Sequence, residues 1–200
     1  MYISHMATRK EQLSIGEYYH IYTRGVDKRK IFCDNSDHTY FLKLLEKCNS
    51  DTNVRIDRPH INSNNSKILT DVLAFTLMPN HIHIMMYEIN DRGTSKYLHK
   101  ILTGYAMYFN KKYKRTGRLF ESVFKNKHIN EDLYLRHLLN YIHFNCIKLV
   151  NKNYKSKELF NEKIELTQKE ILFAKDYSYS SYGYYCGTRN NSIVTRKLSF

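Results

Sequence analysis

Residues 71–89 carry the pattern that most restricts the fold. Two runs of mainly apolar residues, "DVLAFTLM" and "HIHIMMYEI", are separated only by Pro79 and Asn80. The residue before a proline is held extended, and a Pro-Asn pair is typical of a turn. The segment therefore predicts two antiparallel strands joined as a β-hairpin.

The segments on either side predict further strands and helices. The apolar spacing indicates, in chain order, a strand at 17–25, a helix at 34–48, the hairpin, a helix at 94–115, a strand at 118–129 and a helix from 130 to about 150. Asp34 or Ser36 is expected to cap the first helix and Asn130 the last. This order is that of an α+β, ferredoxin-like split β-α-β fold, an antiparallel sheet with helices on one face and the other face open. The pattern of the charged and Tyr-rich remainder, 151–200, does not predict a particular regular structure.

The charge of the chain favours a polyanionic partner. It has 32 Lys and Arg against 19 Asp and Glu, a formal net charge of +13, and 18 tyrosines that offer stacking faces. Such a chain is typical of nucleic-acid-binding proteins, although basic proteins also bind anionic lipids. No apolar run reaches the roughly 18 residues of a membrane helix and no signal peptide is recognisable, so we expect a cytoplasmic protein.

The cysteines and the N-terminus predict little about function. Cys33, Cys48, Cys146 and Cys186 form no C-x-x-C pair, so we expect buried, reduced thiols rather than disulfides or a zinc site. Residues 1–17 are set aside as an N-terminal segment, because its Ser-His-Met resembles the remnant of an expression tag.

His81 and His83 are the first candidates for a functional site. On a strand, alternate side chains share a face, so both imidazoles point the same way with Cα atoms roughly 6.6 Å apart. Two imidazoles so placed can bind one divalent ion, and oxygen ligands in the remaining positions favour Mg²⁺ or Mn²⁺. An isolated His-x-His pair, however, more often only lines a polar face.

The helix at 130–150 carries a second candidate. Leucines and Ile142 form one apolar stripe, and a polar stripe beside it includes Tyr141 and Asn145. These two residues are four apart, so they project from one face and can address one site. The alternative is that Tyr141 is a tyrosine at the edge of the core, with its hydroxyl in solvent.

Four segments together resemble the HUH single-strand DNA transposases, in particular the REP-associated tyrosine transposases. "LMPNHIHIMM" resembles their His-hydrophobic-His strand after a Met-Pro-Asn turn. The others are "YHIYTRGVDKRKIF" at 19–32, "GRLFESVFK" at 117–125 and "YLRHLLNYIHFNC" at 134–146. They follow the order of the family between about residues 18 and 150, which we expect to be the catalytic domain, with 151–200 as a basic extension.

The resemblance implies an enzyme and assigns roles to the candidates. Tyr141 would be the nucleophile that cleaves and rejoins single-stranded or hairpin DNA through a 5′-phosphotyrosine, and His81, His83 and Asn145 would hold Mg²⁺ or Mn²⁺. Cys146 replaces the proline of the family, which puts the reach of Asn145 in doubt. Glu121 is a weak candidate for orienting a histidine. Relatives include monomers and dimers, so both states stay open.

Basic residues are candidates for contacts with DNA phosphates, although each cluster is equally compatible with a solvated face. The candidates are Arg24, Lys28, Arg29, Lys30, Lys111, Lys112, Lys114, Arg115, Arg118, Lys125 and Lys127. The alternative function is a non-catalytic nucleic-acid-binding module, either a DNA repressor or an RNA-binding ferredoxin-like domain. Against RNA binding, the strands at 19–24 and 118–124 lack the Lys/Arg-Gly-aromatic ribonucleoprotein pattern.

Overall fold

The computed structural model describes residues 12–52, 66–154, 165–190, 192–195 and 198. The first eleven residues, with the Ser-His-Met sequence, lie outside this part. Four strands form one antiparallel sheet in the order β2-β3-β1-β4. The strands are Tyr18–Arg24 (β1), Asp71–Met78 (β2), His81–Tyr87 (β3) and Lys125–Ile129 (β4). With one helix between β1 and β2 and another between β3 and β4, this is the ferredoxin-like arrangement expected from the sequence.

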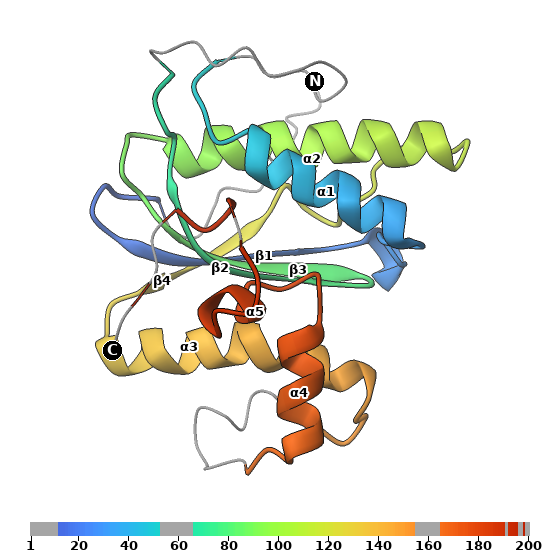
Figure 1. Cartoon of the computed structure of the whole chain (residues 1–200). Coiled ribbons are helices and arrows are strands. Elements are labelled where there is room, and N and C mark those ends of the chain that lie inside the picture. Colours follow the sequence, from blue (N-terminus) through green and yellow to red (C-terminus); the bar gives the residue numbers. More distant parts are fainter. Residues whose placement is uncertain (1–11, 53–65, 155–164, 191, 196–197, 199–200) are drawn as a thin grey trace.

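Two long helices cover one face of the sheet (Figure 1). They are α1 (Asn35–Lys47) and α2 (Gly93–Lys112). Asp34 caps α1 in a capping box with Asp37, so the first of the two predicted caps is correct. Between helices and sheet lies the main apolar core, into which β3 sends Ile82 and Ile84, both fully buried. The predicted alternation of β3 is therefore confirmed on its inward side.

A third helix, α3 (Asp132–Phe144), lies against the opposite face of the sheet (Figure 1). Leu138 and Ile142 of α3 pack on Leu73 of β2 and Met85 of β3. The face that was expected to be available is thus covered in part, because the apolar stripe of α3 requires a partner. The cover is partial, since α3 contacts β2 more extensively than β4.

The bounds of β4 and of α3 differ from the prediction. The last strand begins at Lys125 and not at 118, because Leu119, Phe120 and Phe124 are all buried and do not alternate as a strand would. The N-cap position of α3 is Glu131, whose side chain makes no capping hydrogen bond, and not Asn130. The helix ends at Phe144 rather than near 150. A 3₁₀ segment, Asn145–Leu149 (η2), follows it, so the chain tightens here without a proline.

Gly25 explains the tight bend after β1, where the short 3₁₀ turn Val26–Lys28 (η1) begins. A Cβ on this residue would lie 2.4 Å from the carbonyl oxygen of Arg29, which only glycine avoids. The amide of Gly25 donates to the carbonyl of Asn80 at 2.9 Å. This bond holds the end of β1 beside the turn of the β2–β3 hairpin.

The C-terminal extension contains two short helices, α4 (Gln168–Asp176) and α5 (Tyr182–Tyr185), and it covers the outer edge of β2. The amide of Leu77 donates to Tyr179 at 2.8 Å, and the amide of Ser181 donates to Phe75 at 3.0 Å. The amide of Thr195 donates to the carbonyl of Val72 on the same edge. An exposed sheet edge is a site for pairing with other chains, and here it is occupied by this chain itself.

The cysteines agree only in part with the prediction. Cys48 and Cys146 are buried thiols, but Cys33 and Cys186 are exposed. Within the described ranges, no helix is long and apolar enough to cross a membrane.

Candidate active site

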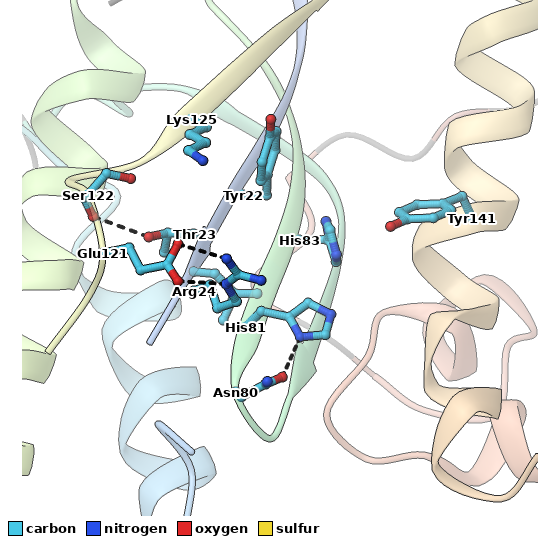
Figure 2. Close-up of a pocket in the computed structure, with 11 residues that line it drawn as sticks. Tyr22, Thr23, Arg24, Asn80, His81, His83, Glu121, Ser122, Lys125 and Tyr141 are labelled. Carbon is cyan, nitrogen blue, oxygen red and sulfur yellow. Dashed lines mark hydrogen bonds and ion pairs between the residues drawn. The ribbon is translucent and has the colours of Figure 1, made fainter. Parts of the chain in front are cut away.

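His81 and His83 lie on the face of β3 that α3 covers in part, as the strand alternation predicts (Figure 2). Their ring centroids are 5.0 Å apart with the planes nearly perpendicular. His83 is 7% exposed, whereas His81 at the start of the strand is only partly buried. The pair thus forms one wall of a hollow that opens toward solvent beside His81.

Each histidine of the pair makes a hydrogen bond through Nδ1. His81 Nδ1 donates to Asn80 Oδ1 at 2.6 Å, since an amide oxygen only accepts. His83 Nδ1 lies 2.9 Å from Nε2 of His20, a buried histidine on β1. Metal-binding histidines commonly use one nitrogen for such a bond and the other for the ion. This arrangement leaves both Nε2 atoms for a ligand.

The surroundings keep the histidines neutral. Burial, reinforced by Lys148 and Arg24, lowers the pKa of His81 to about 4. Burial and the neighbouring His20 and His81 hold the pKa of His83 well below its usual value. Neutral imidazole is the form that ligates metal ions, so the pair is in the binding form at neutral pH.

Tyr141 approaches the pair from α3. Its ring meets His83 edge-on at 5.3 Å and His20 at 6.0 Å between centroids. Figure 2 shows its hydroxyl directed toward the histidines. The amine of Lys148 lies 5.8 Å from the centre of the same ring. The phenol and the imidazoles, 58 residues or more apart in the sequence, therefore meet within one chain.

A cavity of about 480 Å³ connects these groups. It extends from Tyr141 past the histidines to β1, β4 and the segment before β4 (Figure 2). Its lining includes Tyr22, Thr23, Arg24, Asn80, His81, Ile82, His83, Glu121, Ser122, Lys125 and Tyr141. The prediction missed Tyr22 and His20, although their spacing on β1 placed both on the face that carries the histidine pair.

Asn145 does not lie where the sequence placed it. It is the first residue of η2 rather than part of α3, it is fully buried, and it is not in the cavity wall. Its side-chain oxygen and nitrogen are buried and have no hydrogen-bond partner in the described chain. Leaving a buried amide unpaired costs about 1–3 kcal/mol of stability, which a ligand at this side chain would offset. An amide oxygen is a ligand that hard cations prefer. Among the described residues, no three His, Cys, Asp or Glu side chains are grouped to hold a metal.

Glu121 contacts an arginine and not a histidine. Its two oxygens accept from Nε and Nη2 of Arg24 at 2.8 and 3.1 Å. Arg24 holds the pKa of Glu121 below its usual value. The predicted role in orienting a histidine is not seen, because the bidentate pair uses both oxygens.

The basic candidates differ in how far they are available for DNA. Lys112 donates to Asp34 and Asp37 at 2.7 Å each, so its charge is paired with the acidic N-terminus of α1. Arg115 donates to Asn110 at 2.7 Å, and Arg29 lies 3.6 Å from Asp27. The remaining candidates are exposed: Lys28, Lys30, Lys111, Lys114, Arg118, Lys125 and Lys127.

A solved structure shares this architecture. It is described as the structure of a REP-associated tyrosine transposase bound to a REP hairpin, and it matches with a TM-score of 0.57 over 97% of this chain and 100% of the other. The two chains share one fold. Their sequences are only 14% identical, so the likeness concerns the fold alone. No protein-family model and no curated protein matches the sequence significantly.

Proposed function

We propose that this protein is a metal-dependent transposase or nickase that cleaves and rejoins single-stranded or hairpin DNA through Tyr141. The observation that carries the proposal is the meeting of Tyr141 with His81 and His83 at one cavity. The fold shared with a transposase bound to a DNA hairpin supports the same function. So does the net charge of +13, which attracts polyanions.

A divalent cation fits the residues present. The Nε2 atoms of His81 and His83 would hold it, and the unpaired amide oxygen of Asn145 is the candidate for a third ligand. Mg²⁺ and Mn²⁺ suit a site completed by oxygen ligands. Such an ion, when bound, supplies positive charge that polarises the phosphate oxygens.

Tyr141 performs the bond exchange in this proposal. Its oxygen attacks the phosphorus and loses its proton, the bond from phosphorus to the 3′ oxygen breaks, and the released 3′ oxygen gains a proton. The product is a 5′-phosphotyrosine and a free 3′-hydroxyl. One phosphodiester replaces another, so a 3′-hydroxyl reverses the step without ATP.

Two cations near the site would stabilise the phosphate during this exchange. Arg24 lies directly opposite His81 on the neighbouring strand, and the amine of Lys148 lies 5.8 Å from the centre of the Tyr141 ring. Arg24 is fixed by two hydrogen bonds to Glu121, which limits the entropy it loses on binding an anion. Positive groups fixed before the reaction are the most effective form of such stabilisation.

Trapping of a covalent adduct tests the proposal. Wild-type protein, a DNA hairpin with single-stranded flanks and Mn²⁺ should give an SDS-stable protein–DNA adduct that chelation prevents. Tyr141→Phe should give none, and Tyr134→Phe, on the same helix, should react as wild type does. An undiminished adduct in Tyr141→Phe would exclude Tyr141 as the nucleophile.

The burial of Asn145 outside the cavity wall favours one second candidate. A chain that lacks the third ligand would bind the hairpin without cutting it, as a repressor does. In that case binding would be independent of metal, and no adduct would form under any condition.

A further inference from the structure

Tyr22 lies in the cavity beside the histidine pair and has no part in the proposed chemistry. It stands on β1 with His83 directly opposite on one side and Lys125 directly opposite on the other. All three side chains therefore point to the same face of the sheet. Figure 2 shows Tyr22 on the opposite side of His83 from Tyr141.

The two flanks of the Tyr22 ring have different neighbours. Its ring is 5.1 Å from that of His20, two residues earlier on β1, and 6.1 Å from that of His83 on β3. Toward β4, its neighbour is Lys125, which is exposed and carries its amine on the flexible four-carbon stem of every lysine. Tyr22 itself is half-buried. One flank is thus supported by packed imidazoles, and the other borders a side chain that can move aside.

The cavity is larger than the proposed chemistry requires. A volume of about 480 Å³ falls within the range of about 300–1,000 Å³ that holds whole small ligands. The reacting phosphate belongs between Tyr141 and the histidines. The part of the cavity lined by Tyr22, Ser122 and Lys125 is then left for the nucleotide beside it.

The charges in this part of the cavity suit a nucleotide. The carboxylate of Glu121 is paired with Arg24, so it does not present an unpaired negative charge to the cavity. Lys125 contributes a positive charge opposite Tyr22. An aromatic face next to a lysine is the combination that proteins use to bind single strands, since the ring stacks on a base and the amine contacts a phosphate.

We propose that Tyr22 and Lys125 form a nucleotide subsite, in which an unpaired base next to the scissile phosphate stacks on Tyr22 while Lys125 contacts its phosphate. The ligand is single-stranded DNA that flanks a hairpin. The inference rests on the proposed function and extends it, because it assigns the site that holds the strand in place for Tyr141.

Binding to two matched DNAs tests the subsite. The first is a fluorescent stem-loop with thymidine flanks, and the second is the same stem-loop with abasic flanks. Full-length protein carries Tyr141→Phe throughout, so that only binding is measured. The variants added to it are Tyr22→Leu, Tyr22→Phe, Lys125→Gln and, as a control on the same strand and face, Tyr18→Leu.

The subsite predicts effects that depend on the bases. Tyr22→Leu should weaken binding to the thymidine flanks by about tenfold or more and leave binding to the abasic flanks unchanged. Tyr22→Phe and Tyr18→Leu should stay within about twofold of the parent on both DNAs. Lys125→Gln should weaken binding to both and reduce the salt dependence by about one phosphate contact.

Three results would overturn the subsite. These are equal losses on both DNAs for Tyr22→Leu, no loss on either, or a loss for Tyr22→Phe as large as for Tyr22→Leu. If the parent protein bound neither DNA, the proposed function would itself fail. If the parent protein bound both DNAs and Tyr22→Leu had no effect, only the subsite would be excluded.

Discussion

His20 and His83 are joined by a hydrogen bond of 2.9 Å between Nε2 of the first and Nδ1 of the second. Burial, with a smaller effect of Lys127, lowers the pKa of His20 to about 3, so its ring is neutral and one nitrogen accepts. When Nε2 of His20 accepts this bond, His83 carries its proton on Nδ1 and has a lone pair on Nε2. A residue 63 positions away is thus the hydrogen-bond partner of Nδ1 of His83.

The first prediction concerns this bond. His20→Ala should weaken Mn²⁺ binding about 10–100-fold, the usual effect of removing a partner of a metal-binding histidine. His20→Gln, which offers an acceptor in a similar place, should restore part of the loss. Titration followed by electron paramagnetic resonance measures the affinity. The exposed His99→Ala serves as a control, and equal affinities in all variants would remove His20 from this role.

The second prediction concerns pH and His143, which is buried away from the cavity and hydrogen-bonded to Ser181 at 3.0 Å. Burial lowers the pKa of His143 to about 3. Below pH 6.5, the ordinary pKa of histidine, His143 is therefore protonated in the unfolded chain but stays neutral in the folded chain. The free energy of unfolding should fall as the pH drops from 6.5 toward 3, by up to about 1.4 kcal/mol per pH unit for this residue.

Urea unfolding of wild type and His143→Gln at several pH values measures this contribution. The variant should lose less stability between pH 6.5 and 5 than wild type does. Other buried histidines add slopes of their own, so the comparison rests on the difference between the two proteins. Identical slopes would show that His143 titrates normally in the folded state.

The third prediction concerns the contact between the C-terminal extension and β2. Ser181 Oγ accepts from the amide of Phe75 at 2.9 Å, inside the core. Ser181→Ala leaves that amide and His143 without their partner, so it should lower the free energy of unfolding by about 1–3 kcal/mol. The exposed Ser178→Ala should have little effect in the same denaturation experiment. A neutral Ser181→Ala would mean that the extension contributes little at this point.

The fourth prediction distinguishes a role of Lys112 in stability from the role of its neighbour Lys111. The side chain of Asp37 is fully buried, and Lys112 is its ion-pair partner. Lys112→Met should therefore destabilise the fold by about 1–3 kcal/mol without changing the salt dependence of DNA binding. Lys111→Met, at an exposed position, should leave stability unchanged. If Lys112→Met kept full stability and its DNA binding became less dependent on salt, Lys112 would be a DNA contact and not a stabilising residue.

Local pattern in the sequence predicted much of the frame of the molecule. The alternation through 71–87 placed the hairpin, the common face of His81 and His83, and the burial of Ile82 and Ile84. The cap at Asp34 followed in the same way. These features depend on neighbours a few residues apart, which periodicity records directly.

Only the tertiary structure decided the distant contacts that the resemblance did not imply. The bond from His20 to His83, the pairing of Glu121 with Arg24 and the position of Tyr22 between His83 and Lys125 all require the strand order β2-β3-β1-β4. The ion pair between Lys112 and Asp37 and the burial of Asn145 depend on how the helices pack. Periodicity states which face a side chain takes, but the partner on that face is set by contacts between segments far apart in the chain.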